Sequence, residues 1–361
     1  MSIFYLEMQN KSLKINEIEE FDQKRWDEFV LNHKASSPYH LFAWKKAIEV
    51  AYGHKCIYLC AESNEGIHGI LPMAYLHFPG IINEIVGLPF CDVGNCLAES
   101  GQAQDLLLSE AIIFFKKKGI KRLQLRGDLI STQNVRLQLQ SIETGKVRML
   151  LNLPASSEEL FNSFKSKLRS QVRKAKKNRV RFKWGGLDEF DRAYHVFSKN
   201  MHELGSPVHS KSFLKAILYS YGERSKLGIA EYNSKIIGMG IILLGGNGVS
   251  IPWASTLREY NRLGPNMLLY WNFLKFSVDN NYTFFDFGRS SEGEGTYKFK
   301  KQWGAKQTPL VWYELNESGN HIKIKNQNKN NQRRWIAAIW QRIPLKLANG
   351  IGPYLRKYIS L

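Results

Sequence analysis

An internal repeat is the feature that most limits how this chain can fold. The segment SPYHLFAWKKAI at residues 37–48 returns as SPVHSKSFLKAI at residues 206–217, an offset of 169 residues. The same offset carries Gly69 onto Gly238. With 361 residues, the chain is long enough for two domains. The repeat therefore predicts that one domain has been duplicated.

Each copy carries the same order of predicted elements. CIYLCAESNEGIHGILPM and KLGIAEYNSKIIGMGIIL both have the pattern of strand, polar turn and strand. Further on, FFKKKGIKRLQLRG (114–127) and FSVDNNYTFFDFGR (276–289) each predict a helix end that runs into a strand. We therefore predict an α+β protein with mixed sheets flanked by helices. Its domains are expected at residues 1–148 and 149–317, followed by a basic tail at 318–361.

Several familiar classes are excluded. Residues 236–257 are uncharged but interrupted by glycines, which favours a hairpin over a membrane-spanning helix. The N-terminus lacks the apolar core of a secretory signal, so we predict a cytoplasmic protein. The four cysteines are too few for a disulfide scaffold and are not spaced as zinc ligands, which predicts reduced, buried thiols and no metal site.

The positive charge is concentrated in two segments. Lys and Arg number 51 against 32 Asp and Glu, a formal net charge of +19. Ten basic residues lie within 165–183 and nine within 318–361, and neither segment contains an acidic residue. Such patches predict an anionic partner: a phosphate-bearing substrate, tRNA or an anionic membrane surface. The first patch falls on a predicted helix at 160–178, whose Arg169 and Arg173 we expect to bind phosphates.

The tail also contains an amphipathic stretch. Trp335, Ile336, Ile339, Trp340 and Ile343 share one helical face, with arginines nearby. Trp beside Lys and Arg on such a helix is typical of a membrane interface. The sequence therefore predicts either peripheral binding to the inner membrane or docking of the tail onto the body of the protein.

A buried helix is predicted at about 266–278, after the Gly-Pro pair that ends at Pro265. The free N–H groups at its start form a candidate anion site, with Asn266, Arg258 and Arg262 close by.

The strand FFDFG that follows this helix contains Asp286. Because a buried carboxylate must be paired, we expect Asp286 to pair with Arg289, its nearest candidate. The next segment, RSSEGEGTYKFKKQWGA, mixes charged and aromatic residues, which favours a packed site over a solvated turn.

Taken together, these segments resemble a known family. GRSSEGEGTYKFKKQWGA, WASTLREYNRLGPNMLLYW, SKLRSQVRKAKK and LGSPVHS are similar to the FemAB-like branch of the acyltransferases built on the GNAT fold. GLPFCDVGN and HKCIYLCAESNEGIHGILPM in the first half support this, and the resemblance covers roughly residues 25–315. More narrowly, the chain resembles FemAB-family proteins of PEP-CTERM protein-sorting and exopolysaccharide systems.

The resemblance implies two tandem GNAT-like domains, with the active site in the second. It also implies an acyl or aminoacyl transferase that modifies an amine or hydroxyl of a cell-envelope or exopolysaccharide precursor at the inner face of the membrane. No permanently bound cofactor is expected. The acyl donor would be a cosubstrate: aminoacyl-tRNA, acyl-CoA or an acyl carrier protein.

Catalytic roles follow from the same resemblance. The family's Phe-Lys pair before an aromatic-Gly falls on Phe299 and Lys300, which assigns stabilisation of the oxyanion to Lys300. Lys298 and Lys301 are rivals, and alternation along a strand would place Lys298 on the same face as Lys300. A carboxylate would take the amine proton, either Asp286 or Glu294.

Substrate binding is expected from residues around this segment and the basic helix: Arg169, Arg173, His209, Trp253, Arg258, Asn266, Arg289, Lys298 and Phe299. His209 occupies the repeat position of His40, which favours a capping or packing role, although its half holds the other polar residues. The alternative function is a non-catalytic GNAT-fold scaffold that binds RNA or an acyl carrier through the basic patches.

Overall fold

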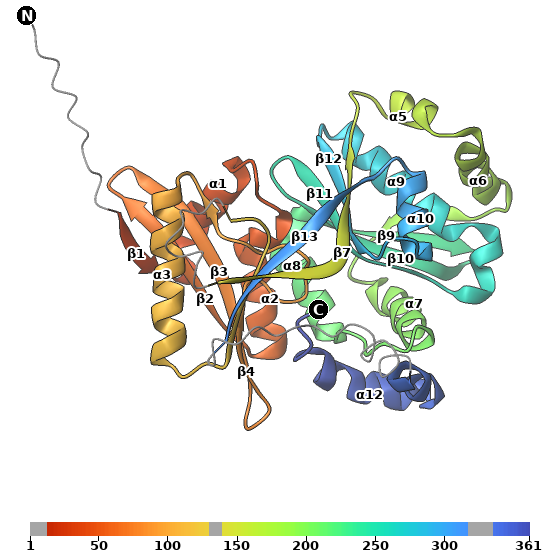
Figure 1. The fold of residues 1–361 in the computed structure, drawn as a ribbon. Coiled ribbons are helices and arrows are strands. Elements are labelled where there is room, and N and C mark those ends of the chain that lie inside the picture. Colours follow the sequence, from red (N-terminus) through yellow and green to blue (C-terminus); the bar gives the residue numbers. More distant parts are fainter. Residues whose placement is uncertain (1–12, 130–138, 317–334) are drawn as a thin grey trace, which may run out of the picture.

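The computed structural model describes residues 13–129, 139–316 and 335–361. Its strands form one 13-stranded sheet in the order β1-β2-β3-β4-β6-β13-β7-β12-β11-β10-β9-β8, and β5 pairs with β3 off this path. In Figure 1 the first half, red to orange, lies on the left, and most of the second half, green to blue, lies on the right.

The elements of the first half are β1 (Lys14–Glu17), α1 (Gln23–Asn32), η2 (Pro38–His40), α2 (Phe42–Tyr52), β2 (Lys55–Ser63), β3 (Gly66–Phe78), β4 (Ile82–Val86), β5 (Leu97–Ala98), α3 (Gly101–Lys117), β6 (Arg122–Arg126) and β7 (Gln140–Asn152). Those of the second half are α5 (Ser157–Ser163), α6 (Ser166–Lys177), β8 (Arg181–Gly185), α7 (Phe190–Glu203), α8 (Lys211–Tyr221), β9 (Ser225–Tyr232), β10 (Lys235–Leu244), β11 (Gly248–Thr256), η4 (Arg258–Leu263), α9 (Pro265–Asp279), β12 (Phe284–Ser290), α10 (Gly295–Gln302) and β13 (Lys306–Asn316). The tail contains a helix at 335–342 and α12 (Leu345–Arg356).

The sequence repeat corresponds to a repeated order of elements. The helix α2 and the hairpin β2-β3 in the first half have α8 and β9-β10 as their counterparts in the second. Gly66 and Lys235, which begin β3 and β10, are separated by the same offset as the sequence repeat. The helices α2 and α8 pack against each other, so each copy covers part of the other. The predicted fold class, mixed strands flanked by helices in two copies, is confirmed.

The two copies exchange strands. β7, from the end of the first half, pairs antiparallel with β12 of the second half. β13, from the end of the second half, pairs antiparallel with β6 of the first half and with β7. Figure 1 shows β7 and β13 crossing between the halves. The predicted domain boundary at residues 148/149 therefore falls inside a strand that completes the sheet of the second half.

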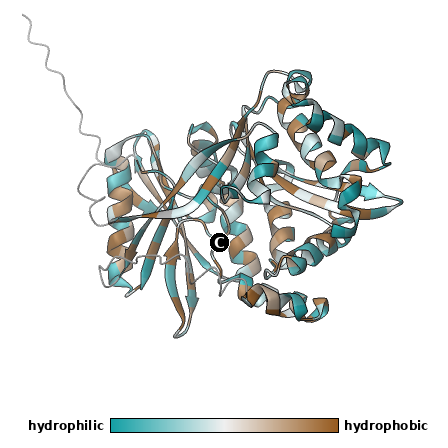
Figure 2. Cartoon of the chain, turned by 45° about the vertical axis from the view of Figure 1, so that its right-hand side comes forward, coloured by the Kyte–Doolittle hydropathy of each residue, from teal (hydrophilic) through white to brown (hydrophobic). Residues whose placement is uncertain are grey.

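Glycines in the sheet make room for α9. A Cβ atom at Gly228 would lie 2.3 Å from the ring of Phe273, and one at Gly240 would lie 2.8 Å from it. Phe273 is fully buried, because the helix sits directly on these two strands. The predicted buried helix at 266–278 is confirmed as α9. Figure 2 shows how hydrophobic residues run along the strands and the covering helices.

The predicted hairpin at 236–257 is also confirmed, as the antiparallel pair of β10 and β11. The four cysteines are free and buried, as expected.

The basic helix predicted at 160–178 is two helices. α5 ends before Phe164, whose extended backbone breaks the helix, and α6 begins two residues later. Phe164 turns into the core, where its ring lies 5.4 Å from the ring of Trp303 and 6.0 Å from that of Trp271. Burial of this large side chain outweighs the local preference for one continuous helix.

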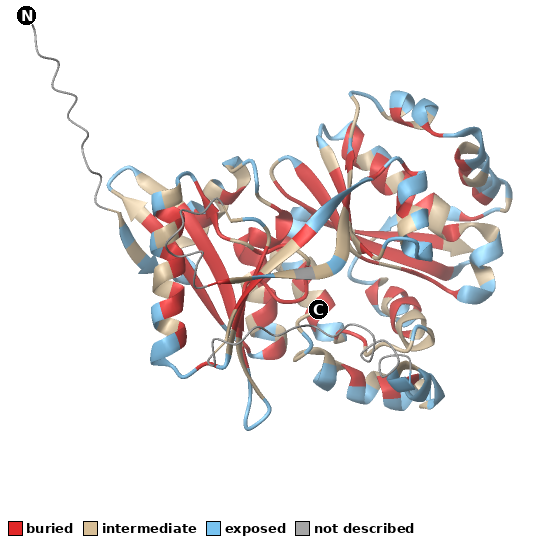
Figure 3. Ribbon diagram, viewed as in Figure 1, coloured by how far each residue is buried: buried red, intermediate tan, exposed pale blue. Residues whose placement is uncertain are grey.

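The tail packs on the body of the protein. Trp340, Ala348 and Gly352 are buried, and α12 lies against α7. The last turn reaches the first half, where Ser360 accepts a hydrogen bond from the backbone N–H of Phe90 (2.7 Å). Figure 3 shows buried and exposed positions alternating along these helices. Of the two predicted arrangements, docking on the body is therefore present, and one face of the tail remains exposed.

Candidate active site

Lys300 lies on α10 and points into the protein. Residues 295–302 form a helix, so the alternation that a strand would impose does not apply: the helix turns Lys298 and Lys301 to solvent and Lys300 inward. The ammonium Nζ donates hydrogen bonds to the carbonyl oxygens of Arg289 (2.7 Å) and Gly288 (3.2 Å). Burial lowers the pKa of Lys300 to about 8, although Asp92 and Asp286 oppose this shift. A lysine with this pKa retains a proton at neutral pH but gives it up readily.

Asp286 pairs with Arg148 rather than with Arg289. Its Oδ2 lies 2.9 Å from Nε and 2.8 Å from Nη2 of Arg148, while Oδ1 accepts the backbone N–H of Gly288 (2.8 Å). The reason is strand pairing: Asp286 on β12 faces β7, and a register shift separates it from Arg289. The expected partner was therefore wrong, although the expectation that this buried carboxylate is paired is confirmed.

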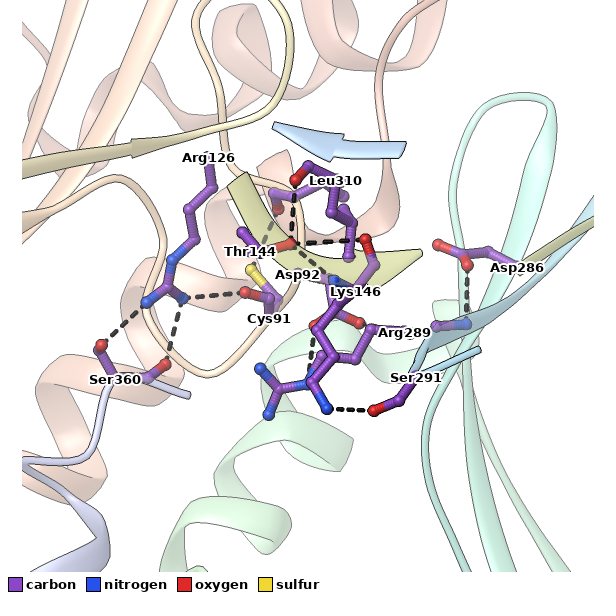
Figure 4. A network of polar contacts seen from close by, with 12 residues as sticks. Cys91, Asp92, Arg126, Thr144, Lys146, Asp286, Arg289, Ser291, Leu310 and Ser360 are labelled. Carbon is purple, nitrogen blue, oxygen red and sulfur yellow. Dashed lines mark hydrogen bonds and ion pairs between the residues drawn. The ribbon is translucent and has the colours of Figure 1, made fainter. Parts of the chain in front are cut away.

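Arg289 is held from the other half of the chain. Asp92 lies in the loop between β4 and β5, and its Oδ2 accepts the backbone N–H of Arg289 (2.9 Å). Its Oδ1 lies 3.4 Å from Nε of the same arginine. Figure 4 shows this contact beside the Asp286 pair and beside Lys146, which reaches Ser291. The loop of the first half thus closes over the turn that carries the acceptors of Lys300.

A buried arginine shapes that loop. Arg126 is fully buried at the end of β6 and donates to the carbonyl oxygens of Leu88 (3.2 Å) and Cys91 (2.9 Å). It also donates to the carbonyl oxygen (3.1 Å) and to Oγ (2.8 Å) of Ser360. Burial lowers the pKa of Arg126 to about 10. The loop that presents Asp92 is therefore fastened to the sheet on one side and to the C-terminal tail on the other (Figure 4).

A cavity lies at the N-terminus of α9. Its volume is about 340 Å³. Its lining residues come from α6, η4, α9 and α10, and they include Gln171, Lys174, Arg262, Asn266 and Phe299. Phe299 precedes Lys300 on α10, so one helix contributes to both the cavity and the polar network.

The sheet opens beside this cavity. The parallel strands β11 and β12 pair only over Gly248–Ser250 and Phe284–Asp286. The backbone of Gly264 is left-handed at φ +82°, and it turns the chain from η4 into α9. The N–H groups of the first turn of α9, together with two cations, suit a phosphate.

The structure brings together only part of the predicted site. Lys300, Asp286 and Arg289 share one network, and Asn266 and Phe299 line the adjacent cavity. Glu294 and Lys298 are exposed on α10, and Arg258 is exposed on η4.

The two arginines of α6 make local contacts with α5. Arg169 donates to the carbonyl oxygen of Asn162 (2.9 Å), and Arg173 lies 5.5 Å from the ring centroid of Phe161. Neither arginine lines the cavity, although the neighbouring Lys174 does.

His209 and Trp253 belong to an aromatic cluster between the halves. Nδ1 of His209 lies 2.8 Å from the hydroxyl oxygen of Tyr52, and its ring centroid lies 5.8 Å from that of Trp253. Burial holds the pKa of His209 well below its ordinary value. Its counterpart His40 bonds to Ser37 in a capping box, and burial lowers the pKa of His40 to about 4. These contacts support the packing and capping roles expected for the two histidines.

Sequence reasoning missed Asp92, Arg126 and Arg148. Asp92 lies within GLPFCDVGN, a segment that carried part of the family resemblance, and an acid in such an apolar loop is a usable signal. Arg148 had no local signal, because its role depends on the exchange of β7.

Comparison with known proteins shows which family the second half resembles, where Lys300 and Asp286 lie. Residues 162–301 match the family model of the acetyltransferase (GNAT) domain. This part of the second half is similar to a GNAT acetyltransferase domain. This places the chain among the acyltransferases, and the matched range includes Lys300, Asp286 and the cavity at α9. The comparison with curated proteins gives no match.

Solved structures share the fold of most of the chain. FemX matches 83% of this chain and 96% of its own, with a TM-score of 0.68 at 13% identity. A tandem GNAT protein from the clavulanic acid biosynthesis pathway matches 86% and 99%, with a TM-score of 0.53 at 9% identity. The C-terminal domain of a putative lysylphosphatidylglycerol synthetase from Agrobacterium fabrum matches 82% and 93%, with a TM-score of 0.57 at 11% identity. The chain thus has the FemAB-like fold of two tandem GNAT domains.

In the described part of this GNAT protein, no helix is long and apolar enough to cross a membrane.

Proposed function

We propose that this protein transfers an activated acyl or aminoacyl group to an amine or hydroxyl of a cell-envelope or exopolysaccharide precursor at the inner face of the membrane. The observation that carries the proposal is the position of Lys300. It is a buried cation on the helix whose Phe299 lines a cavity suited to phosphate, and its acceptor Arg289 is held by a loop from the other half of the chain. The exopolysaccharide context of PEP-CTERM type rests on the sequence resemblance.

Lys300 would stabilise the oxyanion of the tetrahedral intermediate. An ammonium has three N–H donors, and two of them bind the carbonyl oxygens of Gly288 and Arg289. The third is left for a substrate oxygen. Because burial reduces competition from water, a donor held in this way is worth more than one in solvent.

The proton of an attacking amine would go to Asp286 or Glu294. Both carboxylate oxygens of Asp286 already accept hydrogen bonds, which favours a positioning role for this residue. Glu294 is exposed at the start of α10 and has access to solvent.

The donor would be a cosubstrate whose phosphates occupy the cavity at α9. Lys174 and Arg262 supply charge there, and Asn266 supplies an amide. All three donors carry phosphate: aminoacyl-tRNA on the esterified nucleotide, and acyl-CoA and an acyl carrier protein at the far end of the pantetheine arm that bears the acyl group. The phosphate-bearing acceptor would lie toward Arg289, on the side of the first half.

The experiment is a transfer assay with a matched pair of variants. The protein is incubated with acyl-CoA or aminoacyl-tRNA and a small-molecule extract of envelope precursors, and release of free CoA or deacylated tRNA is measured. We expect Lys300→Met to reduce the rate of release about a hundredfold and Lys301→Met, on the exposed side of the same helix, to retain it. If the wild type shows no transfer, and it and both variants bind RNA equally, the protein would instead be the non-catalytic scaffold.

A further inference from the structure

The exposed face of the tail carries an unusual density of large apolar side chains. In α12, Leu347, Ile351, Tyr354 and Leu355 recur at the spacing of one helical face. The preceding helix and the last residues extend the same kind of surface. The exposed large apolar side chains at residues 335–361 are Trp335, Ile336, Ile339, Leu347, Ile351, Tyr354, Leu355 and Ile359. We refer to them as the tail surface.

This surface is held in place by the opposite faces of the same helices. Ala348 and Gly352 are buried on the inner side of α12. Ala337, on the preceding helix, lies against Gly205 at the end of α7, where a Cβ would come within 2.6 Å of it. The carbonyl oxygen of Ile343 lies 2.7 Å from Nε2 of His202. The apolar face therefore belongs to a helix that is docked on the body, and no other described segment covers it.

The tip of the β3-β4 hairpin lies beside the end of the tail. The turn between β3 and β4 exposes Phe78 and, at 77%, Ile81. The ring of Phe78 contacts that of Tyr358 at the end of the tail, with ring centroids 5.4 Å apart. Figure 1 shows the tip of this hairpin and α12 at the same end of the molecule. Two segments far apart in the sequence thus place apolar side chains on one side of the protein.

The charged side chains of the tail are all positive. Residues 318–361 contain no acid. Among the described residues there, Arg342 and Lys346 are exposed next to the apolar positions. An apolar face rimmed by Trp and basic residues matches the chemistry of an anionic lipid interface, where side chains enter the acyl region and cations meet headgroups.

We propose that the tail surface and the tip of the β3-β4 hairpin bind together to the surface of an anionic lipid bilayer. The occupant is a membrane rather than a protein because apolar side chains from two helices and a hairpin tip lie on one side of the protein, and because the tail supplies only positive charge beside them. The inference deepens the membrane location given in the proposed function and rests on it to that extent, but it does not depend on the transfer chemistry, since neither Lys300 nor the cavity at α9 belongs to this surface.

The tail is also connected to the transfer site by hydrogen bonds. Ser360, at the end of the tail, binds Arg126, and Arg126 holds the loop that presents Asp92. The tail is therefore connected, through Ser360 and Arg126, to the loop that presents Asp92.

The test is cosedimentation of the full-length protein with vesicles of phosphatidylcholine, with and without phosphatidylglycerol. We expect binding to the anionic vesicles and little to the neutral ones. Ile351→Ser with Tyr354→Ser should weaken binding about tenfold or more, because two apolar side chains leave the interface. Lys346→Glu should weaken it about fivefold or more. Ile81→Ser tests the hairpin tip separately.

Matched controls come from exposed apolar residues elsewhere. Tyr219 on α8 and Ile113 on α3 are 82% and 56% exposed, and their serine variants should bind vesicles as the wild type does. Thermal unfolding of every variant checks that the fold is retained.

Three results would overturn the proposal. The first is wild-type protein that does not cosediment with anionic vesicles. The second is an equal loss of vesicle binding in the tail variants and in the control variants. The third is a concentration-dependent dimer, seen by light scattering without lipid, that the Ile351→Ser and Tyr354→Ser changes dissolve. That last result would identify the surface as an interface between two copies of the chain. If the tail variants lose vesicle binding but keep normal transfer activity, the membrane surface and the transfer site are shown to be separate, so each proposal can fail without the other.

Discussion

Asp92 of the first half accepts a hydrogen bond from the backbone N–H of Arg289 in the second half, over 2.9 Å and across 197 residues of sequence. The same carboxylate raises the proton affinity of Lys300 against the effect of burial. One side chain thus connects the first copy of the repeat to the network that surrounds Lys300 in the second.

The first prediction concerns Lys300 itself. Lys300→Met should reduce the turnover number about a hundredfold, because loss of an oxyanion donor raises the barrier by about 3 kcal/mol. Steady-state kinetics at saturating substrate measure this, with Lys301→Met as the control. Unchanged turnover in folded Lys300→Met protein would remove the oxyanion role.

The same variant should be at least as stable as the wild type. A pKa near 8 instead of 10.5 means that burial disfavours the charged amine, by about 3 kcal/mol at neutral pH. Two lost hydrogen bonds at about 1 kcal/mol each offset part of the gain. Urea unfolding at pH 7 should therefore show an increase of about 1 kcal/mol. A clear decrease would indicate that Lys300 serves the fold rather than the chemistry.

The third prediction is a pH profile. If protonated Lys300 stabilises the oxyanion, turnover should fall as pH rises through about 8, where the buried amine loses its proton. Stability should change in the opposite direction. Between about 8 and 10.5 only the unfolded chain keeps this proton, so the free energy of unfolding should rise with pH. Turnover that instead rises through pH 8 would indicate that neutral Lys300 acts as the base.

The fourth prediction is that Asp92 supports the reaction by holding Arg289 in position. Asp92→Ala removes the acceptor that holds Arg289, and it should reduce kcat/KM about tenfold. Asp92→Asn, which keeps a hydrogen-bond acceptor, should recover part of the loss. Asp188→Asn, at an exposed site, is the control. Equal effects of the alanine and asparagine variants would contradict a role through this hydrogen bond.

Donor binding should depend on the cavity at α9. Lys174→Ala and Arg262→Ala should each weaken donor affinity about tenfold, as expected for a lost charge-assisted contact to phosphate. Lys176→Ala and Lys177→Ala, exposed on the same helix outside the cavity, should have little effect. Equilibrium binding across a salt series would show the contrast, and equal losses in all four variants would indicate only a diffuse basic field.

Particular elements show which parts of the fold and the site could be predicted from the sequence. The repeat determined the duplicated order of elements, because α2 with β2-β3 and α8 with β9-β10 keep the same offset in sequence and structure. The apolar run at 266–278 determined the buried helix, since apolar side chains all round a helix leave it no solvent face. Lys300 was found through the resemblance of its surrounding motif to a family.

Only the tertiary structure decided which residues surround Lys300. Arg148 reaches Asp286 because β7 crosses to pair with β12, and Asp92 reaches Arg289 because a loop of the first half folds over the second. The inward turn of Lys300 depends on α10, where packing against Tyr270 and Trp303 favours a helix over the strand suggested by alternation. Local patterns describe which face of an element is apolar, but the strand pairing that joins distant segments depends on how the whole sheet packs.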